Sequence, residues 1–166
     1  MRTEEIMATV AIAPDQDVIN AEIQIAAPPA RVFAALTDPE QVPQWWGQQG
    51  MYRITRWQND LRAGGKWRSE GAGADGTTFH VEGEYLEIDP PRLLVHSWKS
   101  SWCGGLNTIV RWELEARHGG TLVRLSHSGF AGNVQAASDH SQGWSRVLVW
   151  MEAFVEEGRT VDTRGA

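Results

Sequence analysis

The sequence predicts an α+β fold in which a curved antiparallel sheet wraps around a long C-terminal helix. From about residue 51 to 129, apolar and polar residues alternate between turn sequences, which predicts six consecutive strands. An amphipathic stretch at about 140–157 predicts a helix that must bury one face. One strand and two short helices, within about 18–47, come before the sheet. The expected order is therefore β-α-α-β-β-β-β-β-β-α.

The length of the chain, 166 residues, suits one domain with a sizeable core. Apolar residues make up 42% and charged residues 22%, as in ordinary globular proteins. We expect an N-terminal tail or arm at 1–16, a single domain at 17–158 and a C-terminal tail at 159–166.

The charge balance argues against several classes of partner. The formal net charge is −6 and the pI is near 5.3, which disfavours a nucleic-acid partner and a polybasic membrane-surface protein. No stretch approaches the roughly 20 apolar residues needed to cross a bilayer, and the acidic N-terminus does not resemble a signal peptide. Cys103 is the single cysteine of the sequence, so an internal disulfide is excluded. We therefore expect a cytoplasmic protein without membrane insertion.

The strands are expected where apolar side chains recur at every second position. In VINAEIQI (18–25) one face is wholly apolar, formed by Ile19, Ala21, Ile23 and Ile25. The six later strands are expected near 51–57, 64–70, 77–88, 92–101, 107–117 and 121–129. A slip of one residue would invert the buried face of a strand, so the register decides which side chains point inward.

The segment TDPEQVPQWWG predicts the second short helix, with Asp38 as its cap, Pro39 in the first turn and Gly47 after its end. In such a helix Trp45 and Trp46 share one apolar face. Two interpretations of this pair stay open and can coexist: the indoles plug the end of the core, or at least one lines the mouth of a cavity.

The C-terminal helix has a clear apolar stripe, formed by Trp144, Val147, Leu148, Met151, Phe154 and Val155. The opposite side is expected to carry Arg146, Glu152, Glu156 and Glu157. Its roughly 18 residues span about 27 Å, enough to cross a small sheet. A curved sheet and a helix of this length enclose space unless large side chains fill it.

Five stretches carry a resemblance to a known superfamily. They are IAAPPARVFAALTDPEQVPQWWG, DLRAGGKWRSEG, GEYLEIDPPRLLVHSW, GTLVRLSHSGF and GWSRVLVWMEAFVE, which together extend over about 18–157. In order and spacing they resemble the START-like, or SRPBCC, superfamily with its helix-grip fold. Within it the chain is most similar to bacterial homologues of the activator of the heat-shock-protein-90 ATPase. The resemblance implies proteins that bind lipids, sterols, hormones or polyketides, with some cyclases and co-chaperones among them.

The nine tryptophans are the unusual feature of the composition. An indole is bulky and has an N–H that needs a partner, so it suits a partly buried wall. We therefore predict a cavity between the sheet and the C-terminal helix that binds a hydrophobic or aromatic small molecule, lipid-like or polyketide-like. The candidate lining residues are Trp46, Trp67, Phe79, Trp98, Trp112, His127, Trp144, Leu148 and Met151.

Two other classes of function fit the sequence. A cyclase or dehydratase would use His127 or a buried acid as general base, although no catalytic motif is present and no catalytic residue is assigned. A module that interacts with a chaperone would present an exposed apolar patch. A homodimer is a further way to cover so much indole surface.

The histidines are candidates for polar contacts with a ligand. His118 in a turn and His140 at a helix start are expected in solvent, whereas His96 and His127 lie on strands and face inward if the register holds. An inward His127 would bond either a ligand or a buried backbone group. A metal site needs three or four convergent ligands, and neither His-x-His nor Glu-x-x-His occurs. We expect no metal and no other cofactor.

The charged residues of the strands are expected mainly on a solvated face. They are Glu82, Glu84, Glu87, Arg68, Arg111 and Arg124. The alternatives are acid–base work by a buried carboxylate pair and an inward arginine that holds an acidic ligand.

Overall fold

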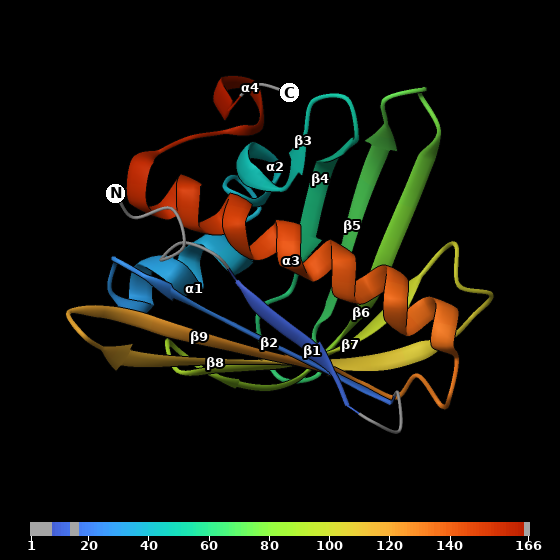
Figure 1. Ribbon diagram of the computed structural model, residues 1–166, viewed down its shortest axis with the longest axis horizontal. Coiled ribbons are helices and arrows are strands. Elements are labelled where there is room, and N and C mark those ends of the chain that lie inside the picture. Colours follow the sequence, from blue (N-terminus) through green and yellow to red (C-terminus); the bar gives the residue numbers. More distant parts are fainter. Residues whose placement is uncertain (1–7, 14–16, 165–166) are drawn as a thin grey trace.

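The computed structural model describes residues 8–13 and 17–164, and within them nine strands form one antiparallel sheet (Figure 1). The strands are β1 (Thr9–Ile12), β2 (Val18–Ile25), β3 (Gly47–Gln48), β4 (Tyr52–Asn59), β5 (Lys66–Gly73), β6 (Thr78–Asp89), β7 (Leu93–Ser100), β8 (Asn107–Arg117) and β9 (Gly120–Ser128). The helices are α1 (Pro29–Thr37), α2 (Val42–Trp45), α3 (Val134–Glu157) and α4 (Val161–Arg164).

The sheet has the order β1-β2-β9-β8-β7-β6-β5-β4-β3, so all strands from β3 to β9 pair with their neighbours in the sequence. The sheet curves strongly, and α3 runs across its concave side with α1 and α2 at one end (Figure 1). The predicted α+β helix-grip fold is therefore confirmed. In this described part no helix is long and apolar enough to span a bilayer.

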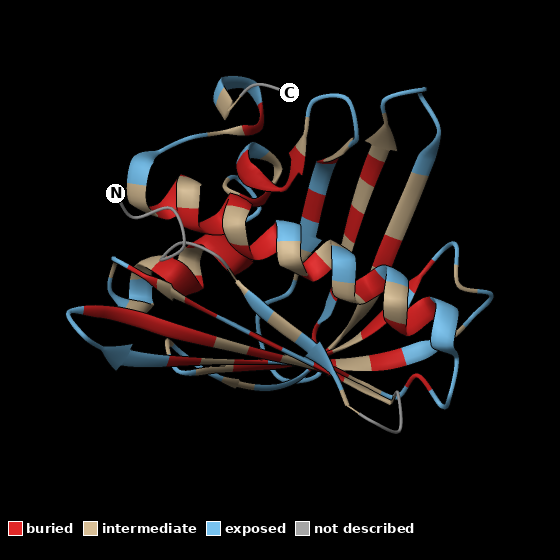
Figure 2. Ribbon diagram, in the orientation of Figure 1, coloured by how far each residue is buried: buried red, intermediate tan, exposed pale blue. Residues whose placement is uncertain are grey.

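The register of the central strands agrees with the predicted alternation. Ile19, Ala21, Ile23 and Ile25 of β2 are all buried. In the β8·β9 pair Val110 lies opposite His127 and Trp112 opposite Leu125, and all four side chains are buried. Figure 2 shows the same alternation as bands of buried and exposed residues along the strands. The inward faces of β8 and β9 therefore form one wall of the core.

Two glycines let aromatic rings lie against the sheet. Gly71 is paired with Phe79, and a Cβ at Gly71 would lie 2.2 Å from the Phe79 ring. Gly83 is paired with Trp67, and a Cβ there would lie 2.7 Å from Trp67 Nε1 and 2.1 Å from the backbone oxygen of Ser97. Any larger residue at either glycine would push the ring off the strand.

The long helix begins earlier than predicted, at Val134 rather than near residue 140. Asn133 caps it, because its side chain accepts a hydrogen bond from the Ala136 N–H at 3.1 Å. The first two turns of α3 contain mostly polar or small residues, so the sequence there shows no apolar periodicity. The helix ends where predicted, at Gly158, which adopts the left-handed conformation with φ of 69°.

The second short helix is shorter than predicted. Asp38 caps a turn rather than a helix, because its carboxylate accepts hydrogen bonds from the Glu40 N–H at 2.9 Å and the Gln41 side chain at 3.0 Å. Only then does α2 begin, with Pro43 in its first turn, where a missing N–H costs nothing.

Both ends of the chain hold structure beyond the predicted core. Within the predicted arm, β1 pairs antiparallel with β2 and also packs beside α3. Within the predicted C-terminal tail lies the short α4. The rest of these tail predictions, for 1–7, 14–16 and 165–166, falls outside the described residues. Glu152 was predicted on the solvated side of the long helix, but it is buried there.

Candidate functional site

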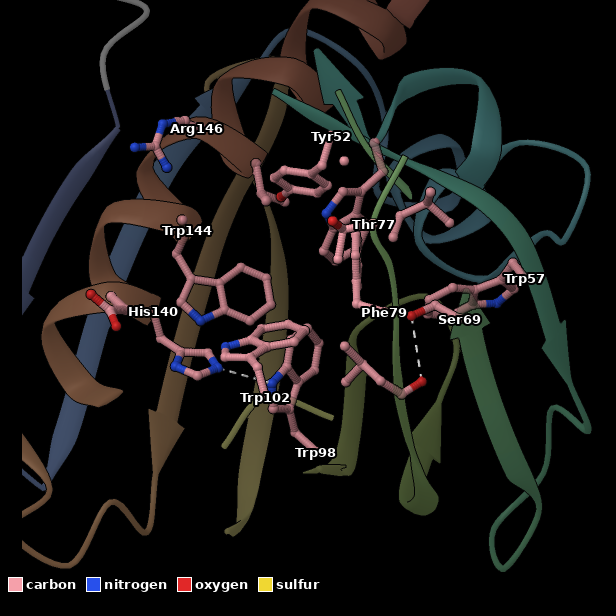
Figure 3. A pocket seen from close by; sticks show the side chains of 17 residues that line it. Tyr52, Trp57, Ser69, Thr77, Phe79, Trp98, Trp102, His140, Trp144 and Arg146 are labelled. Carbon is pink, nitrogen blue, oxygen red and sulfur yellow. Dashed lines mark hydrogen bonds between the residues drawn. The ribbon is translucent and has the colours of Figure 1, made fainter. Parts of the chain in front are cut away.

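A pocket lies between α3 and the concave face of β4 to β7, with a cavity volume of about 410 Å³ (Figure 3). Most of its lining is aromatic or aliphatic, with a few polar side chains. The lining residues are Trp46, Tyr52, Ile54, Trp57, Ser69, Gly73, Thr77, Phe79, Val81, Trp98, Trp102, Asp139, His140, Gly143, Trp144, Arg146 and Val147.

Four indoles form the inner wall of the pocket and are called the indole floor: Trp46, Trp57, Trp98 and Trp144. All four are at least nine-tenths buried. Adjacent rings lie close, with centroids 6.3 Å apart for Trp46–Trp57, 6.5 Å for Trp46–Trp98 and 5.1 Å for Trp98–Trp144. The floor is therefore a continuous aromatic surface.

A second set of indoles, Trp45, Trp67 and Trp112, lies against the floor. Trp45 stacks on Trp46 with centroids 5.1 Å apart, and Trp67 stacks on Trp57 at the same separation. Trp112 meets Trp144 edge to face at 5.6 Å. Each of these pairs supports a floor indole from behind, so three of the four floor rings are packed in place without a guest.

The helix side of the pocket is open at Gly143. This glycine lies within α3, and apart from its chain neighbours and the adjacent helix backbone no described atom lies within 4 Å of the place where its Cβ would be. A glycine at this position costs about 1 kcal/mol relative to alanine, because it weakens the helix. Position 143 of α3 therefore carries a residue that weakens the helix but leaves open space in the pocket.

The mouth of the pocket includes Trp102, in the loop between β7 and β8. Its ring stacks on the His140 ring with centroids 6.1 Å apart and meets Phe79 edge to face at 5.6 Å. The residue is nevertheless 53% exposed. Figure 3 shows Trp102 next to Trp98 and His140 at the same side of the pocket. A guest at this place would cover an exposed indole.

Three buried histidines each accept a hydrogen bond from an indole N–H. Trp112 Nε1 donates to His96 Nε2 at 3.3 Å, and Trp144 Nε1 donates to His127 Nδ1 at 2.9 Å. Trp98 Nε1 lies 3.2 Å from His140 Nε2 and also donates to Ser100 Oγ at 3.0 Å. Two of the four floor indoles are thus oriented by histidines.

The remaining ring nitrogens of these histidines face acceptors. His96 Nδ1 lies 3.1 Å from the Ser97 carbonyl, and His140 Nδ1 lies 2.8 Å from the Ala136 carbonyl. His127 Nε2 lies 2.6 Å from Thr108 Oγ1, whose own proton goes to the Trp98 carbonyl. An indole cannot accept a hydrogen bond in its plane, so all three imidazoles must be neutral.

Burial acts in the same direction on these histidines. It lowers the pKa of His96 to about 4 and the pKa of His127 well below its ordinary value. The pKa of His140 is also lowered by burial, although the Ala136 carbonyl and the Asp139 charge partly oppose this. In the pocket itself, burial raises the pKa of Tyr52. At neutral pH these three histidines and Tyr52 are therefore uncharged.

These contacts predict the tautomer of each histidine. We expect the proton on Nδ1 in His96 and His140 and on Nε2 in His127, because an indole donor occupies the other nitrogen. Long-range ¹H–¹⁵N spectra of the imidazole rings at neutral pH distinguish the two forms directly. The exposed His118 serves as the solvent-accessible reference. Finding the proton of His127 on Nδ1 would contradict the Trp144 contact.

Comparison with known proteins places the chain in a family. The model of the family described as activator of Hsp90 ATPase homolog 1-like protein (AHSA1) matches residues 26–156, most of the chain. The chain belongs to this family. This agrees with the resemblance to the START-like, or SRPBCC, superfamily noted from the sequence, and it supports a small ligand-binding domain in general terms. No curated protein matched the chain.

Solved structures share the fold of this AHSA1-like protein at low sequence identity. A protein from Rhodobacter sphaeroides is 24% identical with a TM-score of 0.78, over 90% of this chain and 97% of that one. A protein from Mycobacterium smegmatis is 18% identical with a TM-score of 0.77, over 90% and 96%. The AHSA1-like protein from Aeromonas hydrophila is 23% identical with a TM-score of 0.69, over 83% and 91%.

The candidate lining residues of this AHSA1-like protein divide into three groups. Trp46, Phe79, Trp98 and Trp144 line the pocket. Trp67 and Trp112 are one layer behind and line a small inner void of about 10 Å³. His127, Leu148 and Met151 are fully buried core residues that do not belong to the pocket lining. His127 instead orients Trp144, so it acts on the pocket through that indole.

Sequence reasoning missed several lining residues, above all Trp57, Trp102, His140 and Gly143. The prediction that His140 lies in solvent was wrong, since it is buried. It rested on a helix start near residue 140, whereas six residues of α3 precede it. For Gly143, the signal was an isolated glycine within a helical pattern, for which a packing or functional reason is usual.

The charged strand residues lie outside the pocket. Arg68 pairs with Glu82 at 2.6 Å, Lys66 with Glu84 at 3.1 Å, and Arg111 with Glu113 at 2.7 Å, all with partly exposed side chains. Their geometry favours the solvated face over acid–base work. In the described part of the chain no group of three or more His, Cys, Asp or Glu residues could hold a metal ion.

Proposed function

We propose that this AHSA1-like protein binds an uncharged aromatic or lipid-like small molecule between α3 and the indole floor. The observation that carries the proposal is the space above the floor that Gly143 leaves in the middle of α3. If these indoles served only as part of the core, we would expect a side chain from α3 to cover them. We place this role in the cytoplasm, where the single Cys103 stays reduced.

The size and lining of the pocket suit such a guest. Ligand pockets usually measure about 300–1,000 Å³ and have apolar walls with a few polar groups, and this pocket measures about 410 Å³. Each Å² of apolar surface removed from water contributes about 25 cal/mol. Ser69, Thr77 and Tyr52 contribute hydroxyl groups to the lining and would orient a guest with one or two oxygen atoms. The packing of the floor indoles against the second set of indoles reduces the ordering cost of binding.

The substitution Gly143→Phe tests the proposal, because it fills the pocket from the helix side. We expect the uncharged fluorescent probe phenylnaphthylamine to bind the wild type and to lose at least tenfold in affinity for the Phe variant, about 1.4 kcal/mol or more. The control is Gly143→Ala, which should keep most of the binding and raise the free energy of unfolding by about 1 kcal/mol. Fluorescence titration and chemical denaturation measure the two effects.

Two results would overturn the proposal: no binding of the probe to the wild type, or equal binding to the wild type and the folded Phe variant. The second result would place the probe elsewhere on the protein. Native mass spectrometry of the protein purified from its own host then identifies the natural guest, which should be absent from the Phe variant.

A further inference from the structure

His140 connects the pocket to the buried histidines. It lines the pocket from α3, and its Nε2 receives the Trp98 indole N–H at 3.2 Å. Trp102 stacks on the same ring at the mouth, with an angle of 18° between the planes. Figure 3 shows the imidazole between the floor indole Trp98 and the body of the helix. A guest bound over the indole floor would therefore reduce the solvent exposure of the His140 ring further.

Protonation of His140 would change the contacts of this wall. Its Nδ1 already faces the Ala136 carbonyl at 2.8 Å, so an added proton goes to Nε2 and meets the Trp98 N–H. Ser100 Oγ, 3.4 Å from Nε2, is the nearby acceptor that can take the new proton, but it already receives the Trp98 N–H. The floor indole Trp98 would thus lose its nitrogen acceptor and share the Ser100 hydroxyl with the imidazolium.

Asp139 favours a positive charge on His140 but is exposed to solvent, and neither His127 nor Cys103 compensates such a charge. On its own helix, Asp139 is exposed and accepts a hydrogen bond from Gln135 at 2.9 Å. From β9, the His127 ring lies 5.1 Å away, so two imidazolium ions would repel each other. Cys103 in the β7–β8 loop is partly buried, and burial raises the pKa of its thiol, so it is neutral. An apolar guest would remove water, the remaining stabiliser of the charge.

We propose that His140 makes guest binding depend on pH, so that the pocket binds an uncharged guest more tightly when His140 is neutral than when it is protonated. This inference rests on the proposed binding function. By linkage, a guest that favours neutral His140 also displaces its proton, so binding in mild acid releases a proton from this residue. The direction agrees with the lowered pKa of His140.

The test is the affinity of phenylnaphthylamine, which stays uncharged, measured between about pH 7.5 and pH 5. We expect a three- to tenfold loss for the wild type across this range. In His140→Gln the probe affinity, whatever its value at neutral pH, should vary less than twofold between about pH 7.5 and pH 5, because an amide oxygen can accept the Trp98 N–H without titrating. His118→Gln removes an exposed histidine and should keep the wild-type profile. Circular dichroism at each pH checks that the fold persists.

A second measurement needs no variant. The pKa of His140, followed by NMR in the wild type, should fall when the probe is bound. Probe affinity that is independent of pH, or an unchanged pKa of His140, would overturn the inference while leaving the binding function intact. Absence of probe binding at neutral pH would instead overturn the binding function, so the two failures are distinguishable.

Discussion

Replacement of Trp45 by alanine is expected to lower the free energy of unfolding by about 3–5 kcal/mol, the usual range for a buried tryptophan. The residue is completely buried, stacks on Trp46, and donates its indole N–H to the Ala35 carbonyl at 2.9 Å. The substitution leaves a cavity at the end of the core and an unpaired acceptor in α1. Denaturant unfolding at neutral pH measures the loss.

The matched variant is Trp46→Ala, one residue away. Trp46 lines the pocket, so part of its surface contacts no other side chain, and removal should cost less stability than removal of Trp45. It should, however, weaken probe binding more, because it removes a quarter of the indole floor. Equal stability losses for the two variants, or a larger effect of Trp45→Ala on binding, would contradict the division of roles.

This division shows what the sequence could predict about the pair. Helical spacing placed Trp45 and Trp46 on one apolar face, and both are buried. The two interpretations of the pair coexist: Trp45 fills the core and Trp46 belongs to the pocket. The assignment of each role depends on Trp57 and Trp98, which lie far away in the chain and stack beside Trp46. Local periodicity holds no information on such contacts.

Trp57 illustrates a second limit. Simple alternation along β4 from the buried Ile54 would place Arg56 inward and Trp57 outward. The pairing of β4 with β5 shifts between Ile54 and Arg56, so Trp57 returns to the inner face. A β-bulge inserts one residue and inverts the pattern beyond it. The central strands β8 and β9 pair without such a shift, and there the predicted inward residues were correct.

The histidine contacts could not be derived from the sequence because each joins two distant segments. His127 and Trp144 lie on β9 and α3, and His96 and Trp112 on β7 and β8. Alternation indicated correctly that His96 and His127 face inward. It could not show that each has an indole as its donor, and hence that the core requires neutral imidazoles.

Acid is expected to destabilise the fold through these imidazoles, on the order of 3 kcal/mol from His96 alone. Its pKa is about 4 in the native state, against about 6.5 in an unfolded chain, and each unit corresponds to about 1.4 kcal/mol. Below about pH 6.5 the unfolded state binds more protons than the native state, so the free energy of unfolding falls with pH. The contribution is complete above that pH and is lost as the pH falls toward about 4. His127, with its pKa also lowered, acts in the same direction.

Carboxylates titrate in part of the same range, so a difference between variants must isolate His96. His96→Gln offers an amide oxygen to the Trp112 N–H but takes up no proton. We expect this variant to be less stable than the wild type at neutral pH. Between about pH 7 and pH 4 its free energy of unfolding should fall less steeply than that of the wild type, by up to about 1.4 kcal/mol per pH unit. His118→Gln should follow the wild type. If denaturant unfolding gave His96→Gln the same pH dependence as the wild type, the imidazole would not be neutral in the core, and the Trp112 contact could not exist as described.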